Sequence, residues 1–329
     1  MSLLITGGAG FIGSNFIYQF LKNHPKERVV CLDKLTYAGN LLTLEPLFSH
    51  PNFRFIQGDI CNRRVVEKVF KEERPDVVVN FAAESHVDRS IKNPNIFLKT
   101  NVVGVQVLLN ACLKFGVKRF HQVSTDEVYG DTSLKSRRKF SEKDHLKPSS
   151  PYSASKAAAD LLVLSYYKTY GLPVTISRSG NNYGPYQHPE KFIPHMIEKA
   201  LNGEDLPIYG TGKNIRDWIY VNDHCRAIDL ILQKGEVGQI YNVGAGEEKA
   251  NLEIVRILSE HLLTYAPKIR IRYVEDRKGH DLRYSLNTEK INLLGWQPQV
   301  SFSDGVKTTV NWYLEHSEWV KSCLKNINL

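Results

Sequence analysis

The sequence predicts an α/β protein with a Rossmann-type doubly wound parallel sheet and a second, smaller α/β domain. Short apolar runs alternate with helical patterns over the first 178 residues, as expected for a parallel sheet covered by helices. A glycine-rich turn joins the first apolar run to the first helical pattern. Beyond residue 178 the alternation becomes irregular, and prolines stand at positions 185, 189 and 194. This change indicates the passage into the smaller domain.

The composition is that of an ordinary globular protein. The chain has 329 residues, 42% of them hydrophobic and 24% charged, so it can bury a sizeable core. Lys and Arg number 43 against 35 Asp and Glu, a formal net charge of +8. Such an excess attracts nucleic acid or phosphorylated small molecules. Because the basic residues are scattered apart from positions 135–139, we expect no nucleic-acid binding.

The cysteines and the N-terminus indicate the compartment. Five cysteines stand at positions 31, 61, 112, 225 and 323 without a CxxC pair. We therefore expect a reducing environment, no disulfide and no metal site. Residues 3–5 are too short an apolar run for a signal peptide, and no apolar run approaches membrane-spanning length. These features predict a cytoplasmic protein without a membrane partner.

The first strand, residues 2–6, leads directly into a glycine-rich turn. Gly7, Gly10 and Gly13 are spaced by two residues, and a helical pattern follows at residues 14–22. Small residues here let the backbone turn tightly and approach a pyrophosphate at the helix N-terminus. The preceding strand and the following helix make this a candidate dinucleotide site.

The second strand, residues 28–32, ends at Asp33. This acid lies 20 residues beyond Gly13, the distance expected for a carboxylate that binds the adenosine ribose. A carboxylate there repels a 2′-phosphate, which favours NAD over NADP. The alternative is an aspartate that only caps a helix. The glycine turn before it favours the ribose role.

Further strands and helices follow in alternation. Residues 53–56 form a predicted strand, after which Asp59 lies where an adenine could be met. Residues 65–70 form an amphipathic helix, and residues 76–81 a continuous apolar strand of the kind buried on both faces. Residues 96–115 form a long helix that is apolar over much of its surface.

A hydroxyl and two carboxylates stand at the end of the next strand, residues 117–123. These are Thr125, Asp126 and Glu127. The carboxyl ends of strands in an open α/β sheet are where ligands bind. Two adjacent acids there suggest a proton donor and a proton acceptor for one substrate. The alternative is a polar turn that caps the next element.

Tyr152 and Lys156 lie four residues apart on one face of a predicted helix, residues 152–170. An ammonium beside a phenol stabilises the phenolate, so we expect the pKa of Tyr152 to fall below its usual ~10. The alternative is an ordinary aromatic–basic pair on a helix surface. Residues 131–148, before this helix, are polar and basic, and we expect a surface loop.

The second half contains less regular elements. Residues 172–178 form a predicted sheet strand, and residues 192–201 a helix. Residues 218–220 are expected to return to the Rossmann sheet. Residues 270–274 alternate charged and apolar side chains, which suits a half-exposed strand. A helix at residues 302–313 is expected to seal the smaller domain.

These motifs together resemble the extended short-chain dehydrogenase/reductase family, and within it the dTDP-glucose 4,6-dehydratases. The glycine turn and the Tyr152–Lys156 pair identify only the superfamily, whereas the triplet beginning at Thr125 is more discriminating. The basic loop at 132–143, the pair at 187–188 and Lys278 depart from the family pattern. The matching segments, in the family's order, are residues 6–13, 35–40, 82–90, 124–130, 152–156, 181–186, 189–191, 214–218 and 276–281.

The resemblance implies a lyase that converts dTDP-glucose to dTDP-4-keto-6-deoxyglucose with NAD regenerated in each cycle. Tyr152, assisted by Lys156, would take the proton of the sugar 4-hydroxyl while hydride leaves C4, and Thr125 would orient the 4-oxygen. Glu127 would then remove the C5 proton. Asp126 would protonate the departing 6-hydroxyl before the hydride returns to C6.

The resemblance also implies a set of binding residues. Lys191, Arg216 and Arg277 are candidate phosphate partners, whereas His280 is as easily structural. The residues expected to bind NAD are Gly7, Gly10, Phe11, Ile12, Gly13, Asp33, Lys34, Leu35, Thr36, Asp59, Ile60, Ala82, Ala83, Ser85, Thr100, Tyr152, Lys156 and Asn182. Those expected to bind the nucleoside-diphosphate hexose are Ser85, Thr125, Asn181, Lys191, Pro207, Tyr209, Arg216, Asn251, Arg277 and His280.

The same resemblance divides the chain and predicts a partner. Residues 1–178 and about 214–243 would form the NAD-binding Rossmann domain, and about 179–213 with 244–329 the sugar-nucleotide-binding domain. The helices at 96–115 and 152–170 would pair across a two-fold axis into a four-helix bundle, giving a homodimer. The alternative is that both helices are only sandwiched within one layer.

Other functions remain open at this point. Nucleotide choice depends on small contacts near Pro207, Tyr209 and Asn251, so a CDP- or UDP-hexose 4,6-dehydratase is the nearest alternative. An epimerase or decarboxylase needs no acid to protonate a 6-hydroxyl. A non-catalytic NAD-binding protein would not need the acid pair beginning at Asp126.

Overall fold

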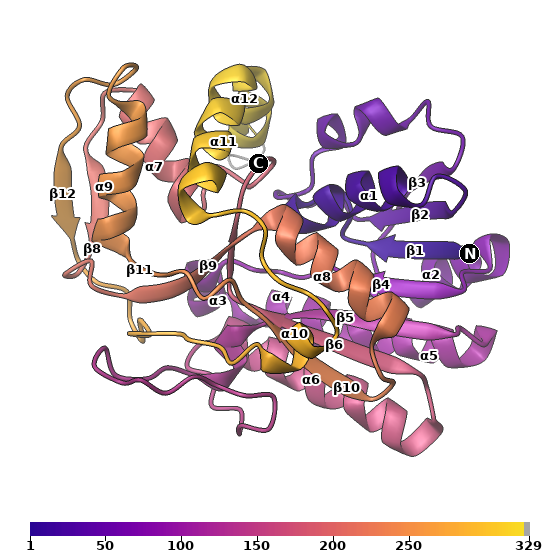
Figure 1. Cartoon of the computed structure of the whole chain (residues 1–329). Helices are drawn as coiled ribbons and strands as arrows, with labels where there is room; N and C mark the ends of the chain where they lie inside the picture. Colours follow the sequence, from indigo (N-terminus) through magenta and orange to yellow (C-terminus); the bar gives the residue numbers. More distant parts are fainter. Residues whose placement is uncertain (326–329) are drawn as a thin grey trace.

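The structure, a computed structural model, describes residues 1–325 and centres on a seven-stranded parallel sheet with helices on both faces (Figure 1). All neighbouring strands in this sheet pair in parallel. In spatial order the strands are β3 (Phe53–Gln57), β2 (Arg28–Asp33), β1 (Ser2–Thr6), β4 (Val77–Asn80), β5 (Arg119–Thr125), β6 (Val174–Ser179) and β10 (Gln239–Val243). The predicted Rossmann-type sheet is confirmed.

The strand order reverses between β1 and β4, which lie side by side at the centre of the sheet. In an open α/β sheet, ligands bind beyond the carboxyl ends of the strands at such a point. The glycine turn follows β1 there, and Ala82 and Ala83 follow β4. The topology therefore positions both segments at one opening.

Apolar side chains on successive positions of the central strands point to opposite faces of the sheet. Leu4 and Val30 belong to the core beneath α2 (Arg63–Glu73), α5 (Val105–Phe115) and α6 (Pro151–Tyr170). Leu3 and Val29 belong to the core beneath α1 (Phe11–Asn23) and α8 (Val221–Lys234). Because both faces are covered, the strands are continuously apolar, as the sequence predicts.

The predicted helix at residues 96–115 begins slightly earlier and contains an irregular turn. It runs as α4 (Pro94–Leu98), a π-helical turn η3 (Lys99–Gly104) and α5. This helix, Pro94–Phe115, is long and apolar enough to cross a membrane, with a mean hydropathy of 1.6 over its best window. The expectation that no segment reaches spanning length is therefore wrong. The signal is weak, because Leu108, Leu109 and Cys112 of α5 pack in the core of the sheet.

A second unit packs beside the sheet and has its own core. It contains a three-stranded sheet and a two-stranded sheet covered by helices, whose side chains form one apolar cluster. The strands are β7 (Asn181–Tyr183), β9 (Ile215–Tyr220) and β11 (Glu248–Ala250), then β8 (Leu206–Tyr209) and β12 (Ile271–Val274). The helices are α7 (Phe192–Leu201), α9 (Asn251–Leu262), α11 (Phe302–Glu315) and α12 (Ser317–Lys325).

One strand lies in a different sheet from the one predicted. The run at residues 218–220 belongs to β9, which pairs with β7 and β11 rather than with the Rossmann sheet. The chain returns to the Rossmann sheet only with α8, which packs against α1, and with β10 (Figure 1). Two further short helices are α3 (Val87–Lys92) and α10 (Glu289–Leu293), and 3-10 turns are formed by η1 (Leu41–Thr43), η2 (Glu45–Leu47) and η4 (Asp126–Tyr129).

The predicted loop at residues 131–148 is irregular but not wholly at the surface. Single bridges connect Thr132 to Arg283 and Phe140 to Leu286. The Phe140 ring is 5% exposed and stacks on Tyr129 with ring centroids 5.3 Å apart. This contact anchors the loop against the turn that carries the acid pair.

Candidate active site

Two adjoining cavities open at the carboxyl ends of the central strands. The first, of about 330 Å³, is lined by the glycine turn, the ends of β2 and β5, and the start of α6. The second, of about 790 Å³, lies between α3, α7 and the segments 207–216 and 277–284. Ser85, Glu127, Asn181 and Lys191 line both cavities, so the two spaces share a wall that contains Glu127.

The glycine turn leaves no room for side chains facing the first cavity. Gly7 has a φ of +71°, and a Cβ there would lie 2.5 Å from the backbone nitrogen of Ala82. A Cβ on Gly13 would lie 2.5 Å from the carbonyl oxygen of Gly7. The backbone of the turn therefore stays open to a pyrophosphate beside the N-terminus of α1, as this motif requires.

Asp33 is held at the end of β2 by backbone donors. Its carboxylate accepts hydrogen bonds from the N–H of Ala9 at 2.9 Å and the N–H of Leu35 at 2.8 Å. Burial raises the pKa of Asp33, while these backbone N–H groups lower it. Next to it, the ammonium of Lys34 forms a 2.8 Å ion pair with Asp59. The charge of Lys34, beside the predicted ribose site, is thus paired with a carboxylate.

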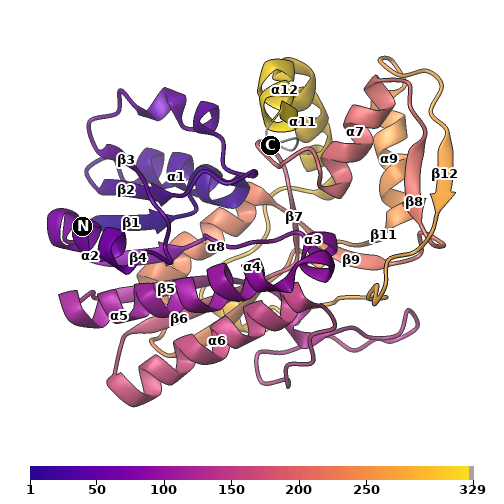
Figure 2. The ribbon, with the colours of Figure 1, turned by 180° about the vertical axis from the view of Figure 1, so that it is seen from behind.

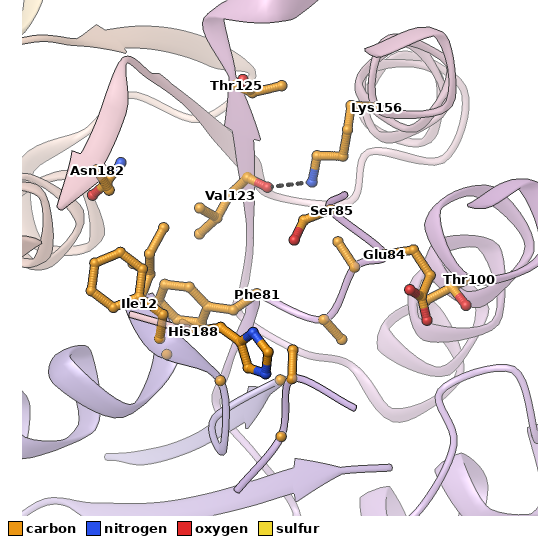
Figure 3. A pocket seen from close by; sticks show the side chains of 18 of the residues that line it. Ile12, Phe81, Glu84, Ser85, Thr100, Val123, Thr125, Lys156, Asn182 and His188 are labelled. Atoms are coloured by element: carbon orange, nitrogen blue, oxygen red, sulfur yellow. Dashed lines mark hydrogen bonds between the residues drawn. The ribbon is translucent and has the colours of Figure 1, made fainter. Parts of the chain in front are cut away.

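The structure brings the predicted cofactor residues together with one exception. All of them line the first cavity except Leu35, which has a φ of +57° and contributes its backbone N–H to Asp33 instead. Of the predicted substrate residues, all but Thr125 line the second cavity, and Thr125 lines the first. The side-chain amide of Asn182 donates to Ser179 at 3.1 Å, which fixes its orientation in the first cavity (Figure 3).

The acid pair stands on the tight turn η4 directly after β5. Thr125 caps this turn: its Oγ1 accepts the N–H of Glu127 at 3.2 Å and donates to Asp126 Oδ1 at 3.3 Å. Asp126 is 2% exposed, and its Oδ2 has no hydrogen-bond partner. An unpaired buried carboxylate oxygen favours the protonated acid.

The two acids differ in their electrostatic surroundings. Burial raises the pKa of Asp126 well above its usual value, and the neighbouring Glu127 and Asp217 raise it further. Burial also raises the pKa of Glu127, but Arg216 and Lys191 lower it. The pair is therefore arranged so that Asp126 holds a proton while Glu127 titrates more readily. Neighbouring carboxyls with separated pKa values can serve as acid and base.

Tyr152 and Lys156 enter the first cavity from the first two turns of α6. The helix is fixed at its start by a reciprocal hydrogen-bond pair between Ser150 and Ser153. The ammonium of Lys156 donates to the carbonyl oxygen of Val123 at 2.7 Å (Figure 3). Burial lowers the pKa of Lys156 to about 8.

The expected fall in the pKa of Tyr152 is not found in the chain alone. Burial raises this pKa above its usual value, and the acids Glu127 and Asp126 raise it further. The expectation is wrong here because the Lys156 ammonium binds the β5 carbonyl of Val123, while two carboxyls lie near the phenol.

The Lys156 ammonium gives a prediction for the pH dependence of activity. Because its pKa lies at about 8, Lys156 is charged below that pH and neutral above it. Turnover that depends on this charge is expected to fall as the pH rises through about 8. A Lys156→Arg variant keeps its charge at higher pH, so its residual activity should lack this alkaline fall. An unchanged alkaline limb in pH–rate profiles of the variant would contradict the assignment.

Cations gather in the second cavity, several of them already bound by protein groups. Arg216 donates to the carbonyl oxygen of Asp281 at 2.9 Å, with its guanidinium 4.3 Å above the Tyr284 ring. Arg277 binds both carboxylate oxygens of Asp88, at 2.5 and 2.9 Å, through Nε and Nη2. The Arg277 guanidinium, which was expected to bind a phosphate, thus already binds Asp88 through two of its nitrogens. The remaining edge of that guanidinium is still compatible with a phosphate.

Lys191 and His280 complete the basic lining. The ammonium of Lys191 donates to the carbonyl oxygen of Ser85 at 2.8 Å, and burial lowers its pKa. His280 binds Asp276 at 2.6 Å between Nδ1 and Oδ1. A cavity with this much positive charge suits an anionic ligand.

Comparison with known proteins identifies the family. Residues 4–309 match the family model described as GDP-mannose 4,6 dehydratase. The chain belongs to this family. The predicted membership of the extended short-chain dehydrogenases/reductases that act as sugar-nucleotide dehydratases is confirmed.

Two relatives align over nearly the whole chain. The chain is 50% identical to the low-salt glycan biosynthesis protein Agl12 of Haloferax volcanii, over 97% of this chain and 100% of that protein. It is 48% identical to the dTDP-glucose 4,6-dehydratase of Haemophilus influenzae, over 96% of this chain and 99% of that protein.

Solved structures of family relatives share the fold. The dTDP-glucose 4,6-dehydratase DesIV of Streptomyces venezuelae, with NAD and TYD bound, is 48% identical with a TM-score of 0.93, covering 98% of this chain and all of that one. The UDP-glucose 4-epimerase of Thermotoga maritima, with UDP-glucose, is 32% identical with a TM-score of 0.88, covering 96% and 99%. The fold is thus common to dehydratases and epimerases, and the acid pair has to decide between them.

Sequence reasoning missed several residues of this family member's site. Asp88, Arg89 and Glu190 line the second cavity, and His188 lines the first. Asp88, Arg89 and Glu190 lie within segments that match the family, 82–90 and 189–191. The resemblance therefore included these positions but assigned no role to their side chains. Tyr284 lies in no matched segment, and only the fold places it over Arg216.

Proposed function

We propose that the chain is an NAD-dependent dTDP-glucose 4,6-dehydratase that produces dTDP-4-keto-6-deoxyglucose. The observation that carries this proposal is the acid pair, of which Asp126 lines the first cavity and Glu127 lines both. An epimerase needs no second acid to expel a 6-hydroxyl. The relatives that are dTDP-glucose 4,6-dehydratases at 48% identity support the choice of nucleotide.

The first cavity fits NAD. The turn through Gly7 and Gly13 presents backbone without side chains, and the acid Asp33 stands at the ribose position. NAD held there would supply the acceptor for the hydride of C4 and the donor that returns this hydride to C6. Lys156, held on the β5 carbonyl, keeps a positive charge beside Tyr152 in this cavity.

In the oxidation step, the chain supplies a base and an orienting hydroxyl. The phenolic oxygen of Tyr152 removes the proton from the 4-hydroxyl of the hexose. The positive charges of Lys156 and of the oxidised nicotinamide favour the phenolate, against the burial that disfavours it. The hydroxyl of Thr125 donates a hydrogen bond to the 4-oxygen and keeps it in place.

In the elimination step, the acid pair acts on neighbouring carbons. The 4-keto group makes the C5 proton acidic, and the carboxylate of Glu127 removes it. Asp126, whose raised pKa keeps it protonated, donates its proton to the departing 6-hydroxyl, which leaves as water. Both protons thus move to or from the turn that carries the acid pair.

Incubation with dTDP-, UDP-, CDP- and GDP-glucose, followed by mass analysis, tests the proposal. We expect dTDP-glucose to lose one water. Loss of water from CDP- or UDP-glucose alone would favour the alternative dehydratases. A product of unchanged mass but altered configuration would indicate an epimerase. Binding of NAD without turnover of any hexose would indicate a non-catalytic protein.

We further propose a homodimer formed through α6 and the helix Pro94–Phe115, which lie side by side on one face (Figure 2). Leu98, Val103 and Leu161 on these helices are 51%, 47% and 59% exposed. Leu161→Asp is expected to shift the protein toward monomers in sedimentation velocity, because it places a charge in the buried interface. Leu293→Asp, at a side chain 88% exposed, is the control. An unchanged sedimentation coefficient for Leu161→Asp would rule out this interface.

We also propose that the chain divides into a cofactor-binding and a substrate-binding domain, and that the protein is cytoplasmic. The separate apolar cluster formed by α7, α9, α11 and α12 supports the division. In this proposed division, β9 belongs to the substrate-binding unit, whereas α8 and β10 belong to the Rossmann unit.

A further inference from the structure

Three side chains that the proposed reaction does not use join three segments at the outer edge of the cavities. We call Tyr37, Arg89 and Glu190 the retention cluster. The guanidinium carbon of Arg89 lies 3.6 Å from the centre of the Tyr37 ring. Its Nη2 donates to Glu190 Oε2 at 3.2 Å. The face of the Arg89 guanidinium thus stacks on the Tyr37 ring, and its edge binds the Glu190 carboxylate.

The cluster borders both cavities. Tyr37 stands between Thr36 and Ala38, which line the first cavity. Arg89, on α3, and Glu190 line the second cavity. Arg89 thereby joins the loop after β2, the helix α3 and the segment before α7. These three segments form the rim between the cofactor side and the substrate side.

The cluster is partly removed from water, which strengthens its contacts. The side chain of Glu190 is 10% exposed and that of Arg89 38% exposed. Burial raises the pKa of Tyr37, so its ring remains a neutral phenol under the guanidinium. The His86 ring lies beside the same carboxylate, with its Nε2 3.6 Å from Glu190 Oε2. A stacked cation contributes more when it is desolvated than at an open surface.

A second set of contacts holds the same rim. The ammonium of Lys191 donates to the carbonyl oxygen of Ser85 at 2.8 Å, joining the segment before α7 to the segment after β4. The Tyr37 ring also meets His188 edge to face, with centroids 5.6 Å apart. The loop that follows Asp33 therefore cannot swing outward without breaking contacts to two other segments.

We propose that the retention cluster keeps the dinucleotide bound throughout the reaction cycle by holding the loop after β2 over the first cavity. This inference rests on the proposed function, in which the hydride taken from C4 returns to C6 of the same sugar. A reduced cofactor that left between these steps would strand a half-converted sugar and an enzyme without its oxidant. A closed rim prevents that loss.

The rate of NAD release tests the inference directly. Wild-type protein and the variants Arg89→Ala, Tyr37→Ala and Tyr37→Phe are loaded with radiolabelled NAD and diluted into unlabelled NAD. Retained label is then followed by filtration. We expect dissociation about tenfold faster for both alanine variants, the size of one stacked cation contact. Tyr37→Phe should match the wild type, because a phenyl ring presents the same face to Arg89.

Control variants separate the cluster from general effects of the substitutions. Arg64→Ala removes an exposed arginine of α2, and Tyr273→Ala removes a tyrosine that is 60% exposed. Both should release NAD at the wild-type rate. Thermal unfolding of every variant establishes that it is folded. Glu190→Gln, which keeps the shape of the side chain, serves if an alanine variant fails to fold, and it should also speed release.

Each outcome decides between retention and another role. Release at the wild-type rate from folded Arg89→Ala or Glu190→Gln would overturn the inference, as would a change confined to the KM of the sugar nucleotide. The double variant Tyr37→Ala/Arg89→Ala should speed NAD release by less than the product of the two single effects, because the two side chains share one contact. Additive effects would contradict a joint role. Failure of the wild-type protein to bind NAD would instead overturn the proposed function.

Discussion

Replacing Asp126 with Asn is expected to slow loss of water by about 10²–10⁴-fold while leaving oxidation at C4 within a few-fold of wild type. The Asp126 carboxyl is 2% exposed, and its raised pKa keeps the proton that the departing 6-hydroxyl requires. An amide of the same shape donates a hydrogen bond but not a proton. In the proposed mechanism, oxidation depends on Tyr152 and Lys156, which lie on α6 rather than on the turn that carries Asp126.

Single-turnover experiments with dTDP-glucose separate these steps. The absorbance of the reduced nicotinamide reports oxidation at C4, and quenched samples analysed by mass report loss of water. Reduced cofactor should therefore accumulate in Asp126→Asn. Asp131→Asn, at an exposed acid on the adjoining loop, should behave as wild type. Equal slowing of both steps would assign Asp126 to substrate positioning rather than to proton donation.

Replacing Arg178 with Leu is expected to destabilise the fold by about 3–5 kcal/mol. Arg178 is 2% exposed and its Nε donates to Asp160, which is fully buried, at 2.8 Å. Its Nη1 donates to the Tyr129 hydroxyl at 2.9 Å, and that hydroxyl donates to Asn242 at 2.8 Å. The substitution removes the guanidinium that pairs with the buried Asp160 carboxylate.

Denaturant unfolding of single and double variants measures this effect. The double variant Arg178→Leu/Asp160→Leu should recover much of the lost free energy of unfolding, because a matched apolar pair replaces an uncompensated charge. Arg63→Leu, which breaks the exposed pair with Glu67, should change stability far less than Arg178→Leu does. A double variant as unstable as the sum of its single variants would show that packing, not charge, dominates at this position.

The sequence predicted the Rossmann sheet and most of its cavity because the relevant signals are local. The glycine turn after β1 and Asp33 after β2 follow directly from strand ends, and both reach the predicted cavity. The predicted helices at 152–170 and 192–201 agree with α6 and α7 to within a residue. Periodicity and strand-end chemistry are therefore enough to place the cofactor side of the site.

The sheet to which β9 belongs could not be predicted, because the sequences of its partner strands show little alternation of apolar and polar residues. The run at 218–220 is as apolar as a central Rossmann strand. Its neighbours, β7 and β11, are three residues long and mostly polar. Pairing between such short segments depends on tertiary contacts rather than on alternation.

The contact partners of individual side chains could not be predicted from the sequence either. Helical spacing places Tyr152 and Lys156 on one face but does not reveal that the carbonyl of Val123 binds the ammonium. Likewise, the spacing of Tyr37 and Arg89 along the chain contains no sign that the guanidinium covers the ring. These contacts join residues far apart in sequence, so only the folded chain brings them together.

The C-terminal helix α12 has a consequence for folding during synthesis. Asn40, in the loop after β2, donates from its amide to Ser322 at 2.6 Å, and the indole N–H of Trp319 donates to the Thr43 hydroxyl at 2.9 Å. These contacts join the cofactor loop to residues made some 280 positions later. The Rossmann strands can pair while the ribosome is still translating the rest. The loop over the adenosine side receives these supports only when α12 has emerged, so a nascent chain would acquire its full grip on the dinucleotide well after the Rossmann strands have been made.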